Sequence, residues 1–258
     1  NFDRYSIYYG LGWLRPAVAA YLRTLHRRTL ATMVPTAALA ADLAGEGLTG
    51  VRVVGRGVDT DLYHPGRRSN GLRERWGVEG EGPACLYVGR VAAEKNLALV
   101  RKTFAAIQVW HPGARMIWVG DGPSAGQLAL EHPDHHFAGM RTGEDLAAHY
   151  ASADLFLFTS LTETYGNVVA EAMASGLPVM AYRSAAAAEL IVQQENGMVA
   201  SPGDERGYVD GALWMLQEAD RLNGMALAAR QSMLPRSWGG VVETFETVAR
   251  EAIASQVR

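Results

Sequence analysis

The feature that most constrains the fold of this sequence is a regular alternation of short apolar runs with longer stretches of helical character, beginning near residue 84. The apolar runs predict strands at Ala84–Val88, Arg115–Val119, His136–Ala138, Asp154–Thr159, Val179–Tyr182 and Gly197–Ala200. The stretches between them predict helices near Asn96–Trp110, Ser124–Leu130, Gly143–Ser152, Gly166–Ser175 and Ser184–Val192. Strands that alternate with helices in this way form βαβ units, so the sequence predicts an α/β fold with a doubly wound, Rossmann-like parallel sheet. The carboxyl ends of the strands then meet at one edge of the sheet, where ligands bind.

The first 60 residues show the same alternation in a shorter form and indicate the tail of a second Rossmann-like domain. Their predicted elements are a helix at Arg15–Arg28, a strand at Thr29–Val34, a helix at Pro35–Ala44 and a strand at Val51–Val54. The turn-rich stretch Tyr63–Ser69 predicts the boundary, and Pro235 precedes a final predicted helix at Ser237–Ser255. We therefore divide the chain into residues 1–62, 63–234 and 235–258. Because the chain opens at Asn1 rather than at a methionine, we expect it to be a fragment of a longer protein.

Composition narrows the class of protein. With 48% hydrophobic and 20% charged residues, the chain can bury a sizeable core and differs from disordered or collagenous sequences. The single cysteine, Cys85, excludes an intramolecular disulfide, fits a reducing compartment and, within an apolar run, predicts a buried structural thiol. No stretch reaches the roughly 18 apolar residues of a membrane span, and no signal peptide is visible, so we expect a cytoplasmic location.

Charge is unevenly distributed along the chain. Residues 1–75 hold eleven arginines, no lysine and six acidic residues, a net charge of +5 within a total of −3. Part of it lies in one predicted helix, at Arg23, His26, Arg27 and Arg28. Two interpretations stay open for this cluster: a solvated helix face, or a surface that meets anionic lipid headgroups or phosphates. A nucleic-acid partner is disfavoured, since the pI is about 6.2 and no recognisable nucleic-acid-binding module is present.

The strongest candidate for a site follows the predicted strand Asp154–Thr159. A polar loop leads into a helix that begins near Gly166, where glycine lets a ligand approach the backbone and the amides of the first turn can seat a phosphate. Glu163 precedes this helix, and Glu171 lies about one and a half turns inside it. One carboxylate can therefore face a sugar while the other meets a ribose. Two glutamates at this spacing are common on surfaces, but their place around a strand–loop–helix junction makes them informative.

A basic motif lies after the predicted strand Ala84–Val88, in the segment Gly89-Arg90-Val91-Ala92-Ala93-Glu94-Lys95-Asn96. Arg90 follows the strand and Lys95 stands where the next helix opens, so both cations can reach the same edge of the sheet as the glutamates. There they can bind an anionic group, for which arginine also offers a bidentate fork. The alternative is an ordinary basic residue at a strand exit, followed by an ordinary lysine at a helix start.

These two segments resemble glycosyltransferase family 4, whose members have the GT-B fold and retain the anomeric configuration of the transferred sugar. Residues 163–171 are similar to its E-x7-E region, and residues 89–95 to its G-R-x4-K element. The resemblance implies catalytic roles for Glu163, which contacts the sugar, and for Arg90 and Lys95, which neutralise the departing diphosphate. It also implies a nucleotide-sugar site made of Gly89, Met140, Arg141, Thr164, Tyr165, Gly166, Asn167, Val168 and Glu171. Within it the loop amides hold the diphosphate, Glu171 binds the ribose hydroxyls, and Met140 and Arg141 contact the base.

The resemblance implies that no metal or other cofactor is required, and two patterns that suggest a metal are interpreted otherwise. Asp59-Thr60-Asp61 is a D-x-D pattern, but it lies in Arg56–Pro65, which resembles the family's interdomain linker. His132, His135 and His136 crowd one loop. Without carboxylate or cysteine partners at ligand spacing, they predict a solvent-exposed cluster.

A finer likeness points to a subgroup that transfers mannose, glucose or sulfoquinovose to lipid acceptors. It rests on Arg56, Val34–Thr36, Ser160–Asn167 and the opening Asn1–Ser6, which in such enzymes lies near the acceptor cleft. The subgroup implies transfer of a hexose from a UDP- or GDP-sugar to an acceptor such as a diacylglycerol-type lipid, with peripheral contact at the inner face of the cytoplasmic membrane. It also implies that residues 1–62 end the acceptor domain and that residues 235–258 cross back to it. Tyr182-Arg183-Ser184 departs from the acidic residue common in relatives, which leaves the identity of the sugar open.

Two other functions stay open. The fragment alone can be a nucleotide-sugar-binding module without activity, because the glycine-rich loop and acceptor groups of a two-domain active site are not found in its sequence. A phosphorylase or epimerase of the same fold would hold pyridoxal phosphate on a lysine, or hydrolyse the donor. Lys95 and Lys102 are the only lysines, and neither context suggests a Schiff base. The family itself implies an internal-return mechanism, in which cationic side chains and a helix dipole stabilise the leaving group.

Overall fold

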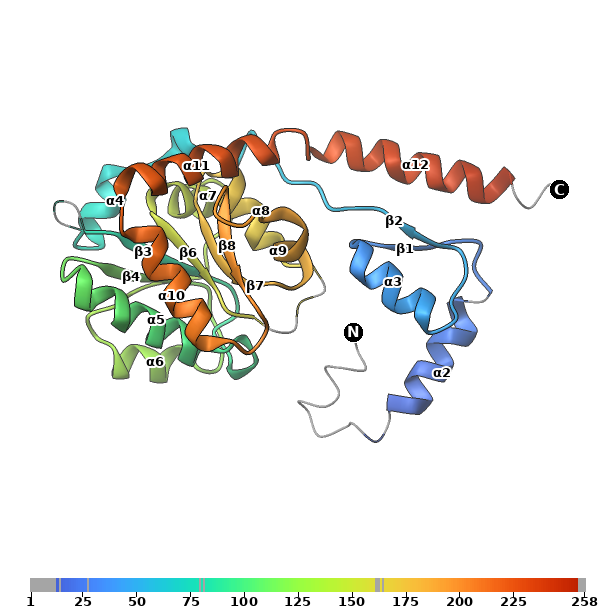
Figure 1. The fold of residues 1–258 in the computed structure, drawn as a ribbon, viewed down its shortest axis with the longest axis horizontal. Helices are drawn as coiled ribbons and strands as arrows, with labels where there is room; N and C mark the ends of the chain where they lie inside the picture. Colours follow the sequence, from blue (N-terminus) through green and yellow to red (C-terminus); the bar gives the residue numbers. More distant parts are fainter. Residues whose placement is uncertain are drawn as a thin grey trace. The chain divides into compact units, whose positions relative to one another are not determined.

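The computed structural model describes residues 13, 15–26, 28–78, 80, 82–160, 163 and 165–254. These residues form two compact units (Figure 1). The larger unit spans Val58–Pro235, and the smaller unit combines the described residues up to Gly57 with those from Arg236 on. The division at Gly57/Val58 lies shortly before the turn-rich stretch at which the sequence predicts a boundary.

The larger unit is built on a six-stranded sheet in which every neighbouring pair of strands is parallel. The strands are β3 (Ala84–Val88), β4 (Arg115–Val119), β5 (His136–Gly139), β6 (Leu155–Phe158), β7 (Val179–Tyr182) and β8 (Gly197–Ala200). Their order across the sheet is β5-β4-β3-β6-β7-β8. The predicted α/β class with a doubly wound parallel sheet is therefore confirmed.

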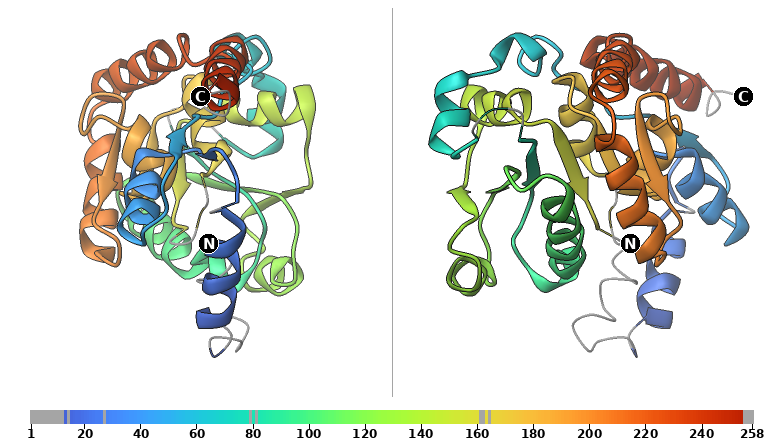
Figure 2. Two further views of the ribbon diagram at one scale, coloured as in Figure 1. Left: turned by 90° about the vertical axis from the view of Figure 1, so that its right-hand side faces the viewer. Right: turned by 60° about the vertical axis from the view of Figure 1, so that its left-hand side comes forward.

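Helices cover both faces of this sheet (Figures 1 and 2). One layer holds α5 (Leu97–Trp110), α6 (Ala125–Glu131) and α10 (Glu205–Leu216). The other holds α4 (Asn70–Arg75), α7 (Gly143–Ser152), α8 (Asn167–Ala174) and α9 (Ala185–Leu190). Helix α11 (Ala219–Met233) packs against both α8 and α10.

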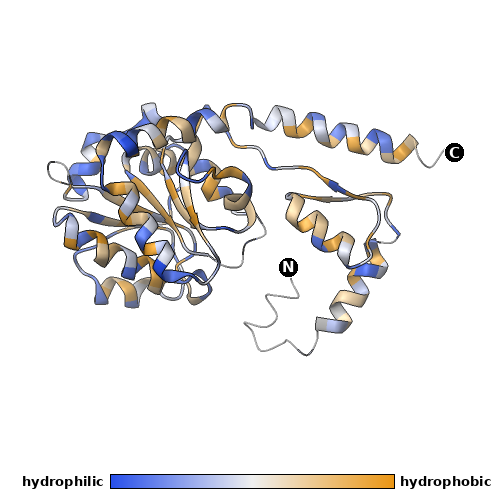
Figure 3. Ribbon diagram, in the orientation of Figure 1, coloured by the Kyte–Doolittle hydropathy of each residue, from blue (hydrophilic) through white to orange (hydrophobic). Residues whose placement is uncertain are grey.

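The strands of the larger unit are hydrophobic along most of their length because both of their faces are covered (Figure 3). In β3, Leu86 and Val88 join the core beneath α7 and α8, whereas Cys85 and Tyr87 join the core beneath α5 and α10. Cys85 is fully buried, as its apolar context predicts. Burial raises the pKa of its thiol, which makes a nucleophilic role at neutral pH unfavourable.

The chain reverses its direction of travel across the sheet at β3. Strands β4 and β5 lie on one side of β3, and β6, β7 and β8 lie on the other. At such a switch point the loops that leave two adjacent strands turn away from each other and open a crevice for a ligand. The loops after β3 and β6 therefore define the candidate site.

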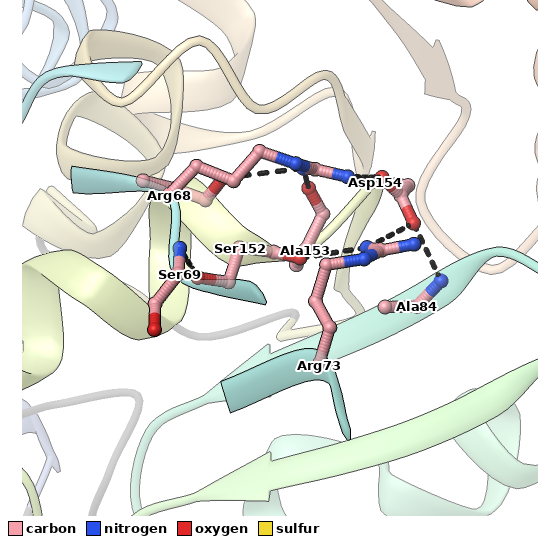
Figure 4. A network of polar contacts seen from close by, with 8 residues as sticks. Arg68, Ser69, Arg73, Ala84, Ser152, Ala153 and Asp154 are labelled. Carbon is pink, nitrogen blue, oxygen red and sulfur yellow. Dashed lines mark hydrogen bonds and ion pairs between the residues drawn. The ribbon is translucent and has the colours of Figure 1, made fainter. Parts of the chain in front are cut away.

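A polar network aligns the opposite, amino ends of the same two strands (Figure 4). Asp154, directly before β6, accepts hydrogen bonds from Arg73 Nη1 at 2.7 Å and from Arg68 Nη2 at 2.9 Å. The same carboxylate accepts a hydrogen bond from the backbone amide of Ala84, the first residue of β3, at 2.8 Å. This mostly buried acid thus ties β3 and β6 to α4 and to Arg68, which directly follows the 3₁₀ turn η2 (Pro65–Arg67).

The smaller unit contains α2 (Arg15–His26), β1 (Thr32–Val34), α3 (Ala37–Gly45), β2 (Val51–Val53) and α12 (Trp238–Ala254). Strands β1 and β2 pair in parallel, with Thr32 opposite Val51. Thr36 caps α3, since its hydroxyl accepts the amide of Leu39 at 3.2 Å. Among the helices of the described residues, none combines the length and the apolar character that a bilayer-spanning segment needs.

Two predicted boundaries in the smaller unit are wrong for the same reason: the end of the first helix at Arg28, which lies at His26, and the start of the next strand at Thr29. The amides of Arg28 and Thr29 bond to the carbonyls of Leu25 and His26, so the chain continues to turn after α2. The Thr29 hydroxyl also donates to the His26 carbonyl at 2.8 Å. The strand predicted from Thr29 therefore begins only at Thr32.

Candidate functional site

The loop after β3 is packed tightly against the loop after β4. The amide of Val91 donates to the carbonyl of Asp121 at 2.9 Å, and the amide of Ser124 donates to the carbonyl of Val91 at 3.0 Å. Gly120, at φ +126°, comes so close to the first loop that a Cβ there would lie 2.0 Å from the carbonyl oxygen of Gly89. Only glycine fits this position, and the backbone that carries Arg90 is consequently held in one place.

The loop after β6 delivers the chain into α8 through Gly166. This residue is the N-cap of α8 and has φ +91°, a left-handed conformation that favours glycine. Asn167 and Val168 form the first turn, whose amides have no acceptor within an α-helix and can point at an anion. The predicted helix start at Gly166 is therefore displaced by one residue, because Gly166 caps the helix rather than joining it.

Lys95 and Glu163 meet at the switch point. The Lys95 ammonium donates to Glu163 Oε1, and both side chains are mostly buried, with 16% and 18% of their surface exposed. The backbone supports the pairing, because the buried Thr159 hydroxyl donates to the carbonyl of Lys95 at 2.8 Å. The motif after β3 and the motif after β6 thus form one constellation in space.

Arg90 lies at the solvent side of this constellation. Its side chain is 55% exposed and pairs with Glu94 at 3.2 Å, so it can swing toward a ligand at low cost. Its carbonyl accepts a hydrogen bond from the buried Tyr87 hydroxyl at 2.9 Å. Burial and the charges of Glu163 and Glu94 raise the pKa of Tyr87, which keeps the phenol protonated as a donor.

Glu171 lies in α8 and is bound by a tyrosine from α7. Tyr150 Oη donates to Glu171 Oε2 at 2.9 Å, and the Tyr150 side chain is fully buried. Burial raises the pKa of Glu171, while the hydrogen bond from Tyr150 lowers it. A half-buried carboxylate with one oxygen fixed in this way is a suitable acceptor for hydroxyl groups.

For the remaining predicted site residues, the contacts in the structure say less about a role in binding. Met140 is 68% exposed, and the guanidinium of Arg141 donates to the carbonyl of Ala138 at 2.9 Å and pairs with Asp145 at 3.1 Å. Tyr165 is buried, and its carbonyl accepts the amide of Ala186 at 2.8 Å. Thr164 lies outside the described residues.

The D-x-D pattern has a local structural role. Asp59 Oδ1 accepts the backbone amides of Asp61 at 3.1 Å and Leu62 at 2.8 Å. This is the side-chain turn that aspartate commonly makes, and it explains the pattern without a metal.

The histidine cluster differs from the prediction. Its three imidazoles are half-buried rather than solvent-exposed, and the ligand atoms of His132, Asp134 and His135 lie within 4.8 Å of one another. A carboxylate partner does therefore lie at ligand spacing. However, Trp118 Nε1 donates to His135 Nδ1 at 3.2 Å, and Arg101 Nη1 lies 3.4 Å from His132 Nε2. Because an indole only donates, Nδ1 is already used as an acceptor, and the adjacent guanidinium further disfavours a cation.

Sequence reasoning missed two residues that shape this site, Thr159 and Tyr150. The sequence predicts Thr159 only as the end of a strand, and its contact with the Lys95 carbonyl depends on how β3 and β6 pair. Tyr150 belongs to a predicted helix, and its reach to Glu171 depends on the packing of α7 on α8. Neither contact leaves a signal at fixed spacing along the chain.

The fold and the charged side chains at its switch point define the larger unit as a Rossmann-like domain of the type found in GT-B glycosyltransferases. Residues 82–218 match the family described as glycosyl transferases group 1. The chain belongs to this family.

Characterised relatives match along most of this chain. A GDP-mannose-dependent alpha-mannosyltransferase of Mycobacterium tuberculosis is 36% identical over 231 residues, which are 89% of this chain and 59% of the relative. The sulfoquinovosyl transferase SQD2 of Arabidopsis thaliana is 33% identical over 239 residues, 89% of this chain and 46% of the relative. The chain therefore spans about half the length of these relatives.

Solved structures show the same fold at lower identity. TarM of S. aureus, solved with UDP, has a TM-score of 0.74 at 14% identity and matches 89% of this chain and 46% of its own. Anabaena Alr3699/HepE in complex with UDP has a TM-score of 0.73 at 22% identity, with 89% of this chain and 65% of its own matched.

Proposed function

We propose that this chain is the donor-binding part of a retaining glycosyltransferase that moves a hexose from a UDP- or GDP-sugar to a lipid acceptor. The observation that carries the proposal is the ion pair of Lys95 with Glu163, which joins motifs 68 residues apart at the switch point. The relatives, an alpha-mannosyltransferase and a sulfoquinovosyl transferase, support a sugar-transfer reaction.

The chemistry required is stabilisation of a departing nucleoside diphosphate. Transfer breaks the bond between the anomeric carbon and the phosphate oxygen, and an acceptor oxygen forms the new bond with retention of configuration. The acceptor's hydroxyl proton passes to the leaving phosphate oxygen. Lys95, Arg90 and the amides at the start of α8 supply positive charge where the diphosphate becomes more negative. Glu163 holds Lys95 in place and can accept a hydrogen bond from a hydroxyl group of the sugar.

We also propose that donor binding needs no divalent metal, because these groups supply the charge that a metal would otherwise provide. Removal of divalent cations with EDTA should leave the Kd for the nucleoside diphosphate unchanged. Weaker binding that returns on addition of Mg²⁺ or Mn²⁺ would contradict this part of the proposal.

Binding of the donor tests the proposal directly. In calorimetric titrations with UDP, GDP and ADP, we expect saturable binding of UDP or GDP. Lys95→Ala should weaken it by roughly tenfold or more, the size of one lost charge-assisted hydrogen bond. Lys102→Ala is the matched control, since Lys102 is 59% exposed and its ion pair among the described residues is with the exposed Glu205 at 2.7 Å. Absence of nucleotide binding, or unchanged binding in both Lys95→Ala and Glu171→Ala, would refute the proposal.

A lipid acceptor implies contact with a membrane surface, and α2 is the candidate for it. Arg23 and Arg28 lie near its end, and Tyr21 and Leu25, one turn apart, are 68% and 48% exposed. Arg27 lies outside the described residues. Each arginine near an anionic bilayer contributes about 1 kcal/mol.

Vesicle co-sedimentation tests this contact. We expect binding to vesicles that contain phosphatidylglycerol and none to phosphatidylcholine alone. The double change Arg23→Glu and Arg28→Glu should abolish it, whereas Arg206→Glu, at a 93% exposed position of the larger unit, should not. Equal behaviour of the two variants would remove α2 from the proposal.

A second function, a nucleotide-sugar-binding module without transfer, is favoured by the coverage of the relatives. The chain spans 59% and 46% of two enzymes whose activity belongs to the whole protein. A radiolabelled transfer assay with lipid acceptors separates the two functions. Saturable donor binding without any transfer would favour the binding module.

A further inference from the structure

A carboxylate that recognises a diol must keep its position before the ligand arrives. A free glutamate side chain loses about 1.5–2 kcal/mol of rotamer freedom when it becomes ordered. A group that fixes the carboxylate in advance removes that cost from binding. Glu171, the residue proposed above to bind the ribose hydroxyls, has such a group in Tyr150.

The Tyr150 ring is held from two sides. Its edge contacts are to Tyr63, with ring centroids 5.8 Å apart at 79°, and to Phe156, at 5.8 Å and 69°. The ring is fully buried, so its hydroxyl has little freedom to leave Glu171. A buried phenol also needs a hydrogen-bond partner, which Glu171 Oε2 provides at 2.9 Å.

The choice of acceptor distinguishes Tyr150 from other buried tyrosines. Tyr87 donates to the carbonyl of Arg90, and Tyr208 donates to the carbonyl of Met180 at 2.8 Å. Each of those bonds fastens a tyrosine side chain to a backbone carbonyl. The bond of Tyr150 instead fastens a functional side chain, and it engages only one of the two carboxylate oxygens.

We infer that Tyr150 is a positioning residue for donor selectivity: it fixes Oε2 of Glu171 and so presents the second oxygen to the ribose diol of the nucleotide. This inference rests on the proposed function, because it deepens the role given there to Glu171. The bond also favours the ionised carboxylate, which is the better acceptor for two hydroxyl groups.

Selectivity for ribose tests the inference. The probes are GDP and UDP, each beside its 2′,3′-dideoxy form, titrated by calorimetry into the whole chain. Tyr150→Phe should weaken binding of the ribonucleotide roughly tenfold, the size of one hydrogen bond, and leave binding of the dideoxy form unchanged. Tyr208→Phe is the matched control, since it removes an equally buried hydroxyl that donates to a carbonyl. It should preserve the preference for ribose.

A double-mutant cycle with Glu171→Gln adds a readout that general loosening of the fold cannot imitate. If Tyr150 acts through Glu171, Tyr150→Phe should cause no further loss in the Glu171→Gln background. Should Tyr150→Phe fail to fold, Tyr63→Leu removes the ring contact and leaves the hydroxyl bond possible. It must then show the same selective loss at smaller size.

The outcomes separate the inference from the proposed function. If the unchanged protein binds neither GDP nor UDP, the proposed function fails and the inference fails with it. If it binds and prefers the ribonucleotide, but Tyr150→Phe keeps that preference or weakens both probes equally, only the inference is refuted. Loss confined to the ribonucleotide, and absent from Tyr208→Phe, supports both.

Discussion

Replacement of Asp154 by asparagine tests whether one carboxylate aligns the two strands that carry the site. The carboxylate accepts from Arg73 at 2.7 Å, Arg68 at 2.9 Å and the Ala84 amide at 2.8 Å. Asparagine preserves the shape but keeps a single acceptor oxygen and turns an amide donor toward the other partners. The change therefore removes the negative charge without opening a cavity.

The size of the effect follows from exposure. Loss of one charge-assisted hydrogen bond costs about 1.5–3 kcal/mol, and a buried ion pair that loses one partner costs about 3–5 kcal/mol. Arg73 is 15% exposed and Asp154 is 18% exposed, whereas Arg68 is 43% exposed. Water can partly solvate Arg68, which places the expected loss at about 2–4 kcal/mol of unfolding free energy.

The assay is thermal unfolding followed by circular dichroism, with urea unfolding as a second measure. For a unit of this size the loss corresponds to a Tm lower by roughly 4–16 °C. The control is Glu144→Gln, which breaks the pair with Arg67 at a glutamate that is 79% exposed and should cost less than about 1 kcal/mol. Equal Tm values for the two variants would show that burial does not decide the strength of these pairs.

Three further outcomes are expected. Ala185 has φ +46°, so Ala185→Gly should raise the unfolding free energy by up to about 1 kcal/mol in urea titrations, whereas Ala188→Gly, exposed in α9, should lower it by about as much. Because burial raises the pKa of Glu171 above its ordinary 4.5, the folded state binds the extra proton and its stability falls as pH rises from 4.5 through the folded pKa. Glu171→Gln should therefore exceed the unchanged protein in Tm at pH 7 and match it below pH 4.5; a difference independent of pH would contradict this. The buried Cys85, whose pKa burial raises, should react with iodoacetamide only when urea unfolds the protein, and rapid labelling of the folded protein would show that the sheet opens locally.

The sequence predicts the sheet well because its strands are covered on both faces. Four strands, Ala84–Val88, Arg115–Val119, Val179–Tyr182 and Gly197–Ala200, have the predicted bounds, since continuous apolar runs end sharply at polar or glycine residues. The predicted ends of the helices agree less well with the structure. Residues such as Thr36 and Gly166 cap helices, and a cap is only half inside the element that it ends.

The candidate site is predicted only in part. Motif spacing places Lys95 and Glu163 at the carboxyl edge of the sheet, but their direct pairing depends on the order of strands, which spacing does not encode. The contact of Tyr150 with Glu171 depends on helix packing. The prediction for the histidine cluster is wrong for two reasons. Burial beside Trp118 arises only when the chain folds, whereas Asp134 stands between His132 and His135 in the sequence and is a carboxylate that the pattern already offers.

The close approach of Gly120 to Gly89 restricts how this domain can be redesigned. A methyl group at Gly120 would overlap the Gly89 carbonyl, and one at Gly122 would lie 2.4 Å from the Val91 carbonyl. A mutagenesis library aimed at a new sugar donor should therefore leave both glycines untouched, since nearly every variant there would be lost before selection. Gly139 and Gly143, where an added Cβ meets nothing within 4 Å, have room for a side chain, although their positive φ favours asparagine or aspartate over other replacements. Diversity introduced there would alter the contacts to the base that are proposed for Met140 and Arg141, while the backbone under Arg90 stays as it is.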